Sequence, residues 1–323
     1  MVINAVGDIM LSGSRNSFFA RSGYDYPFAV TADILHNADV SVGNLENPVS
    51  YGGKEFKGKR FRFRGDPAMV SALQKAGFSL LTLANNHILD YGSSALQETI
   101  AQLDRCGISH VGAGKTVAEA RQVKILNIKG KRVAFLAYSL TQPDEFYATA
   151  TRPGTAPGFA SYVTADIASA RSMADYVIVS FHWGGEGESS ARPYQISAAH
   201  KAIDAGADVV LGHHPHVLQG VERYRRGVIL YSLGNFAFAS MSRISATSMI
   251  ARITLDDEKT DLEIIPINVL NSQVRFQPKP MYGKQGERVI EKLNRLSSAL
   301  GSEISSSEGR YLLLDRTAAY ASK

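Results

Sequence analysis

Short hydrophobic runs recur along the chain, and several of them end directly at a glycine, an asparagine, a histidine or an acidic residue. These runs are rich in Val, Ile and Leu and show no strict alternation, which is typical of strands that are buried on both faces. We expect such strands at residues 2–6, 39–42, 78–84, 133–138, 176–181, 209–211 and 228–233. Two further runs, 249–255 and 262–267, flank the polar turn 256–259 and predict an antiparallel pair.

Segments with helical periodicity lie between these runs. Asp66 followed by Pro67 is a typical helix start, and the helix predicted there ends at Gly77, a typical stop. Similar patterns predict helices at 93–107, 164–174, 193–206 and 287–300. Strands that alternate with helices of this length indicate βαβ units, and therefore an α/β fold with a largely parallel or mixed sheet.

Polar side chains stand just after the predicted strands. In such sheets the carboxyl ends of the strands converge on one edge, which is where ligands bind. The residues in positions of this kind are Asp8, Asn44, Glu46, Asn86, His87, His182, His214 and His216. Carboxylate, amide and imidazole groups without cysteine suit Mn, Zn, Fe or Mg. The sequence therefore predicts a metal site at this edge.

The sharpest element of this set is His214-Pro215-His216. In an extended segment, side chains two residues apart point to the same face, and the proline between them stiffens the backbone. We expect two metal ligands on one rigid loop. The neighbouring His213 is expected to point away from them.

Two segments fit neither pattern. Residues 140–161 predict a long loop over the site edge, and residues 302–307 predict a polar tail after the last helix. We therefore divide the chain into a main domain, 1–270, and a C-terminal helical extension, 271–323, packed on the same domain.

Composition narrows the function classes. With 45% hydrophobic and 20% charged residues the chain is an ordinary globular protein, and its single cysteine excludes an internal disulfide or a four-thiolate zinc site. The net charge of +5 is too modest to indicate nucleic-acid binding. We see no apolar run long enough for a membrane span and no signal peptide, so we expect a cytoplasmic protein unless an export signal has been trimmed. The oligomeric state is left open.

Seven motifs occur in order between residues 7 and 236, and together they resemble the CapA, or poly-γ-glutamate capsule synthesis, family, which is related to the calcineurin-like metallophosphoesterases. The motifs are Gly7-Asp8-Ile9-Met10, Gly43-Asn44-Leu45-Glu46-Asn47-Pro48, Phe63-Arg64-Gly65-Asp66-Pro67, Leu83-Ala84-Asn85-Asn86-His87 with Asp90-Tyr91-Gly92, Phe181-His182-Trp183-Gly184, Gly212-His213-His214-Pro215-His216 and Ser232-Leu233-Gly234-Asn235-Phe236.

The resemblance implies a four-layer α/β/β/α sandwich with mixed sheets and a centre of one or two divalent metal ions. It implies that Asp8 binds the first metal and that the 43–46 turn supplies a carboxylate near both ions. Asn86 and His182 would bind the second metal, and His214 and His216 would divide between the two. His87 would protonate the leaving atom or hold the transition state, with Asp90 orienting it.

Two positions depart from the phosphoesterase pattern. Met10 stands where a histidine is usual, and Asn44 stands where an aspartate is usual. A neutral amide offsets the repulsion of two cations poorly. Either Glu46 bridges the two ions, or the site holds a single tightly bound metal.

A basic segment, residues 54–64, interleaves cations with phenylalanines. In a strand, Arg60, Arg62 and Arg64 would share one face, where guanidinium groups bind carboxylate or phosphate. We therefore expect Arg62 and Arg64 to bind an anionic substrate. Asn235 is a further candidate for holding a backbone or substrate group.

The leading hypothesis is a metal-dependent hydrolase that cleaves a γ-glutamyl or peptide-like amide or a phosphoester in an anionic substrate. The partner would be an anionic small molecule or a γ-glutamyl polymer. The alternative is a non-catalytic protein that binds or handles a capsule polymer. A third hypothesis, a nucleotide phosphodiesterase, is supported only by analogy with the fold.

Overall fold

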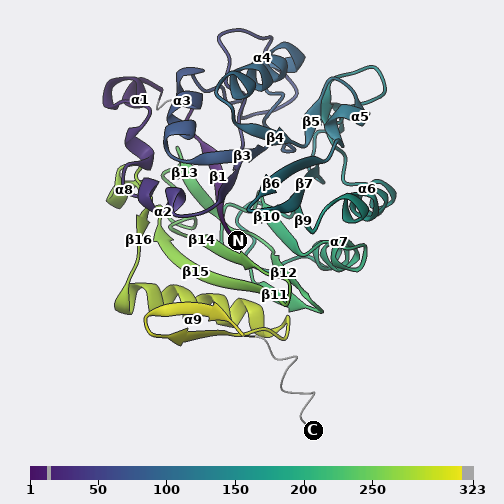
Figure 1. Cartoon of the computed structure of the whole chain (residues 1–323). Helices are drawn as coiled ribbons and strands as arrows, with labels where there is room; N and C mark the ends of the chain where they lie inside the picture. Colours follow the sequence, from purple (N-terminus) through teal and green to yellow (C-terminus); the bar gives the residue numbers. More distant parts are fainter. Residues whose placement is uncertain (13–15, 315–323) are drawn as a thin grey trace.

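Two mixed β-sheets pack face to face in the computed structural model, which describes residues 1–12 and 16–314 (Figure 1). The first sheet has the order β17-β18-β15-β14-β1-β2-β3-β4, with β13 on β1 and β16 on β15. Its strands are β1 (Val2–Met10), β2 (Val40–Leu45), β3 (Phe78–Thr82), β4 (Ser109–Val111), β13 (Asn235–Phe238), β14 (Thr247–Leu255), β15 (Thr260–Asn268), β16 (Lys279–Pro280), β17 (Ile304–Ser307) and β18 (Arg310–Leu313).

The second sheet has the order β11-β12-β10-β9-β7-β6. Its strands are β6 (Lys124–Ile128), β7 (Lys131–Ser139), β9 (Tyr176–His182), β10 (Val209–His213), β11 (Val221–Tyr224) and β12 (Gly227–Leu230). Two short strands, β5 (Ala113–Gly114) and β8 (Gly154–Thr155), form a separate pair.

Helices cover the outer face of each sheet. Those near the first sheet are α1 (Asn16–Ser22), α2 (Ala32–His36), α3 (Ala68–Lys75) and α4 (Gly92–Arg105), with the 3-10 turn η2 (Tyr26–Phe28). On the second sheet lie α5 (Val117–Ala120), α6 (Ala160–Met173) and α7 (Pro193–Asp204). The expected four-layer α/β/β/α arrangement is confirmed. None of the helices in the described ranges has the length and hydropathy that a bilayer crossing requires.

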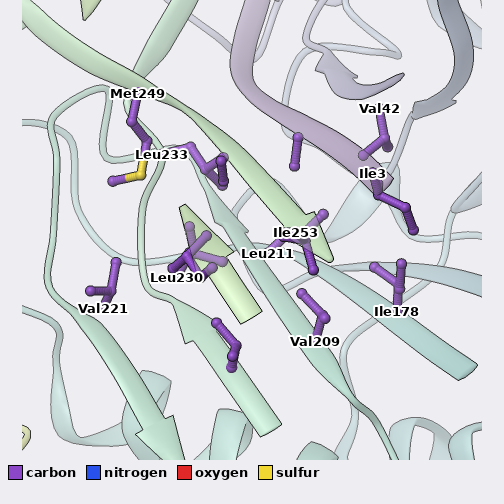
Figure 2. Packing of buried hydrophobic residues seen from close by; sticks show 14 of the residues in the cluster. Ile3, Val42, Ile178, Val209, Leu211, Val221, Leu230, Leu233, Met249 and Ile253 are labelled. Atoms are coloured by element: carbon purple, nitrogen blue, oxygen red, sulfur yellow. The ribbon is translucent and has the colours of Figure 1, made fainter. Parts of the chain in front are cut away.

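Burial on both faces explains why the strand sequences do not alternate. In β1, Ile3 and Ala5 face the core between the sheets, whereas Val6 and Ile9 face the helices. The two sheets interdigitate through branched side chains, which Figure 2 shows for a set that includes Ile3, Val42, Ile178, Val209, Leu211 and Leu230. The polar residues Asp8 and Asn44 stand near the carboxyl ends of β1 and β2, where the strands leave this core.

The segment after residue 270 contains strands as well as helices. It forms α8 (Asn271–Val274), β16, α9 (Gly283–Ser298) and the hairpin β17–β18, and both β16 and β18 pair with β15. Residues 302–307 are therefore not a simple polar tail, because 304–307 form β17. The boundary at residue 270 stays a prediction, and residues 315–323 of the expected extension lie outside the described range.

Three other boundaries differ from expectation. The run 228–233 is not one strand: β12 ends at Leu230, and the chain crosses to the first sheet, where β13 begins at Asn235. The helix expected at 164–174 begins earlier, at Ala160. The expected loop 140–161 is irregular except for the turn η3 (Asp144–Phe146) and β8, and its last two residues belong to α6.

We predict that Gly7→Ala destabilises the protein by roughly 1–3 kcal/mol through overpacking. A Cβ at Gly7 would lie 1.8 Å from the carbonyl oxygen of Gly234, so β13 would have to move off β1. The matched control is Gly52→Ala, where a Cβ meets nothing within 4 Å. Urea unfolding should show a lowered midpoint for Gly7→Ala alone. An unchanged midpoint would contradict the close packing of β1 on β13.

Candidate metal centre

The strand register itself brings polar residues of both sheets together. In the first sheet Asp8 of β1 is aligned with Asn44 of the parallel strand β2 and with Asn235 of β13. In the second sheet His213 of β10 is aligned with His182 of the parallel strand β9. The carboxyl ends of β1, β2, β9 and β10 and the first residue of β13 lie at the same place, so the five side chains meet without a dedicated loop.

Asp8 is fully buried and surrounded by donors. Its Oδ1 accepts a hydrogen bond from Asn44 Nδ2 at 2.9 Å and lies 3.1 Å from His213 Nδ1. Its Oδ2 accepts one from the His214 backbone N–H at 3.2 Å and lies 3.2 Å from His216 Nδ1. Burial alone would raise the pKa of Asp8, but the hydrogen bonds and charges of His213 and His216 hold it well below its ordinary value. Asp8 is therefore a stable anion.

Glu46 is also fully buried, yet neither of its carboxylate oxygens has a hydrogen-bond partner among the described residues. Its Oε1 lies 3.4 Å from His182 Nε2 and 3.7 Å from His216 Nε2. Burial and the nearby charge of Asp8 raise the pKa of Glu46 well above its ordinary value. A buried carboxylate without partners is costly unless something else offsets its charge.

The histidines face the same space. His182 Nε2 lies 2.9 Å from Asn86 Oδ1, and the rings of His182 and His214 are 4.8 Å apart. His214 Nδ1 is buried without a partner among the described residues, and burial lowers the pKa of this ring to about 3. Burial also lowers the pKa of His182. Neutral imidazole is the form that binds a metal.

The segment His214–His216 is not extended as we expected. His214 and His216 both have positive φ, 95° and 59°, which is strained for non-glycine residues. Their rings nevertheless converge, at 5.9 Å between centroids. His213 does not point away from the group, because it contacts Asp8.

These donors fit a divalent cation. The ligand atoms of Glu46, His182 and His214 lie within 4.8 Å of one another, and so do those of Asp8, Glu46 and His216. Glu46 belongs to both groups, so its unpartnered oxygens lie where a carboxylate shared by two ions would be needed. Both carboxylate oxygens of Glu46 and Nδ1 of His214 are buried without a hydrogen-bond partner among the described residues, and this observation favours a bound cation.

Asn44 does not offer a free ligand atom. Its Nδ2 donates to Asp8, and its Oδ1 accepts hydrogen bonds from Thr82 Oγ1 at 3.3 Å and Asn85 Nδ2 at 3.1 Å. Asn44 as a metal ligand therefore stays a prediction, and in this structure its amide contacts Asp8. Glu46 carries the free carboxylate of the turn.

His87 forms a separate group at the rim. Its Nδ1 lies 2.6 Å from Asp90 Oδ2 and 2.8 Å from Lys59 Nζ, and Lys59 also pairs with Asp90 at 2.8 Å. Burial lowers the pKa of His87, and the charge of Asp90 opposes this shift. The ring packs on Phe63 at 4.9 Å between centroids. Asp90 thus orients the ring, and Lys59 anchors Asp90.

A cavity of about 310 Å³ opens beside this group. Its walls are Met10, Lys59, Arg60, Phe61, Phe63, Asn86, His87, Glu186, His216, Phe238 and Ser240. It joins the group around His87 to the candidate metal ligands. Phe146 of the 140–161 loop lies nearby, with its ring centroid 5.3 Å from Lys59 Nζ.

The expected strand face of three arginines is wrong, because residues 60–62 form no strand. Only Arg60 lines the cavity. Arg62 pairs with Glu55 at 2.7 Å, and Arg64 stacks over Tyr91 at 4.4 Å and lines a different cavity. The cavity beside the metal centre therefore receives one of the three guanidinium groups, not the two we expected to bind substrate.

Asn235 contacts a histidine. Its Oδ1 lies 2.9 Å from His216 Nδ1, next to Asp8. His213, Lys59 and Glu186 were not among the expected site residues, although Lys59 belongs to the basic segment 54–64. The histidines at positions 213, 214 and 216 are a sequence signal that could have identified His213. No local sequence pattern distinguishes Lys59 from its basic neighbours.

Comparison with known proteins identifies the same family that the sequence motifs resemble. A sequence profile of the family described as "Bacterial capsule synthesis protein PGA_cap" matches residues 2–240. The chain is 32% identical over 289 residues to the capsule biosynthesis protein CapA of Bacillus anthracis, covering 87% of this chain and 69% of that protein. It is 32% identical over 268 residues to the PGA biosynthesis protein CapA of Bacillus subtilis (strain 168), covering 82% and 70%.

Among solved structures, the NAD nucleotidase (NadN) of Haemophilus influenzae aligns with a TM-score of 0.53 at 12% identity. The alignment covers 92% of this chain and 63% of that chain. At this identity the likeness concerns the fold alone.

We predict that Glu46→Gln stabilises the metal-free protein at a pH of about 8 but removes most of the stabilisation that Mn²⁺ provides. Because folding raises the pKa of Glu46, the metal-free wild type loses stability as the pH rises above the ordinary value of 4.5. Each pKa unit of displacement is worth about 1.4 kcal/mol. Glutamine does not titrate, so the stability of the metal-free variant does not fall in this way as the pH rises.

The measurement is urea unfolding with a chelator and with Mn²⁺, at about pH 5 and about pH 8. Glu222→Gln is the matched control, since Glu222 is buried but contacts Tyr231 and His200. Its response to Mn²⁺ should equal that of the wild type. Equal stabilisation of Glu46→Gln by Mn²⁺ would contradict the assignment.

Proposed function

The chain belongs to the bacterial capsule synthesis protein family PGA_cap, and from this premise we propose that it is a metal-dependent hydrolase acting on an anionic substrate. The observation that carries the proposal is the buried carboxylate of Glu46, whose two oxygens have no partner among the described residues and which lies between three histidines. Asp8, Glu46, Asn86, His182, His214 and His216 would hold one or two divalent ions.

A bound divalent cation lowers the pKa of a water ligand and polarises the oxygen of the scissile bond. The protein supplies the proton. Asp90 holds Nδ1 of His87, which leaves Nε2 of the ring to exchange a proton with a group in the cavity. An anion in the cavity favours the protonated ring and so prepares it to protonate the leaving atom.

The cavity walls favour an anionic substrate. Lys59 and Arg60 place two cations in the cavity lining against the one carboxylate of Glu186, and Phe61, Phe63 and Phe238 supply apolar surface around them. Guanidinium binds carboxylate and phosphate alike. The scissile bond is therefore proposed as either a γ-glutamyl or peptide-like amide or a phosphoester. The name of the B. subtilis relative, which refers to PGA biosynthesis, favours the amide.

A second candidate is a non-catalytic protein that binds a γ-glutamyl polymer. The favouring observation is the exposed cationic loop that carries Lys54, Lys57 and Arg60, of which Arg60 lines the cavity. In this case His87→Ala leaves the affinity for poly-γ-glutamate intact, and no hydrolysis occurs with any substrate offered. Turnover that depends on His87 would exclude this candidate.

We predict that His87→Ala lowers kcat by about 10²–10⁴-fold while Mn²⁺ binding stays unchanged, because the variant loses proton transfer and keeps the metal ligands. The assay compares bis-p-nitrophenyl phosphate with γ-glutamyl peptides in the presence of Mn²⁺. His36→Ala, at an exposed histidine of α2, is the control and should retain full activity.

Asp90→Asn should give a smaller loss of kcat than His87→Ala and an altered pH profile, because it changes the orientation and charge partner of the ring. Full activity of His87→Ala on a substrate that the wild type hydrolyses would contradict the proton-donor role. Hydrolysis that continues unchanged after chelation would contradict the metal-dependent mechanism.

A further inference from the structure

Glu186 reaches the metal centre from outside the strand-end set. It lies in the loop that follows β9, and it lines the cavity together with His87 and His216. The Glu186 residue is exposed, unlike Asp8 and Glu46. The carboxylate therefore borders the open side of a site whose other carboxylates are buried.

The loop that carries Glu186 is fastened to the histidine turn. The backbone N–H of Gly187 donates to the carbonyl oxygen of Pro215 at 2.8 Å, between the two ligand histidines. Gln219 Nε2 donates to the carbonyl oxygen of Glu188 at 2.8 Å. Gly184 and Gly187 adopt positive φ, 86° and 77°, which permits the tight course of the chain. The position of Glu186 beside His214 and His216 is thus built into the backbone.

The two acidic residues of this loop differ in their partners. Glu188 forms a bidentate pair with Arg192, at 2.6 and 2.5 Å. Glu186 has no ion-pair partner of this kind among residues 1–12 and 16–314. Instead, its carboxylate and the ring nitrogens of His214 and His216 offer ligand atoms that all lie within 4.8 Å of one another.

We propose that Glu186 is an outer ligand of a divalent cation held by His214 and His216. The inference rests on the proposed function, since it concerns the same centre. His216 also belongs to the group with Asp8 and Glu46, and His214 to the group with Glu46 and His182. The buried carboxylates bind from the interior, and Glu186 binds from the solvent side.

The exposure of Glu186 gives this ligand a distinct property. A carboxylate at the edge of water exchanges more easily than a buried one, so an anionic substrate that enters the cavity can replace it on the cation. Loss of Glu186 should therefore weaken the binding of the cation in the absence of substrate, without affecting the buried ligands.

The test is titration of the metal-stripped full chain with Mn²⁺, followed by calorimetry and by the electron paramagnetic resonance signal of free Mn²⁺. We expect Glu186→Gln to weaken one binding event by about tenfold or more, on the scale seen when groups that support a metal site are removed. Glu188→Gln, from the same loop, is the matched control and should bind Mn²⁺ as the wild type does.

The unfolding midpoint of metal-stripped Glu186→Gln should equal that of the wild type, because the side chain has no structural partner to lose. Wild-type affinity and stoichiometry in Glu186→Gln would overturn the inference while leaving the proposed function in place. An equal loss in Glu188→Gln would also overturn it, since the effect would then belong to the loop. Absence of Mn²⁺ binding by the wild type would contradict both proposals.

Discussion

Asp8 and Glu46 are buried side by side, and the surrounding protein satisfies only one of them. Asp8 receives hydrogen bonds from Asn44 and the His214 backbone, whereas both oxygens of Glu46 lack a hydrogen-bond partner among the described residues. Two neighbouring carboxylates away from water repel each other, and that repulsion must be offset by a cation or by a proton. The imidazoles of His182 and His214, whose pKa values are lowered by burial, are neutral ligands beside these two carboxylates.

The sandwich can hold these charges because its backbones approach closely at glycine. Two glycines in addition to Gly7 show this close approach. A Cβ at Gly212 would lie 2.0 Å from the carbonyl oxygen of Tyr231. A Cβ at Gly43 would lie 2.9 Å from the side chains of Ile9 and Val6. These glycines stand next to site residues in the sequence, at Asp8, His213 and Asn44. The close packing of the strands at these glycines therefore also fixes the positions of the neighbouring site residues.

Much of the fold could be predicted, because strands buried on both faces leave a pattern that is readable without knowing their partners. The strand-end rule also grouped Asp8, Glu46, His182 and His216 correctly in space. The remaining errors have physical reasons. Whether Asn44 binds a metal or orients Asp8 depends on which neighbours, Thr82 and Asn85, reach its oxygen, and no spacing encodes that.

The expected shared face of Arg60, Arg62 and Arg64 failed for a similar reason. These residues lie in an irregular loop, where the spacing of the cations does not determine which side chains point the same way. β17 went unpredicted because its serine-rich sequence resembles a tail until Arg310–Leu313 pairs with it. Anomalous diffraction at the manganese edge from Mn²⁺-soaked crystals shows whether a cation lies between Glu46 and the histidines. We expect a peak at bonding distance from Glu46 and from at least one of His182, His214 and His216. Well-ordered crystals with no peak within reach of Glu46 would contradict this expectation.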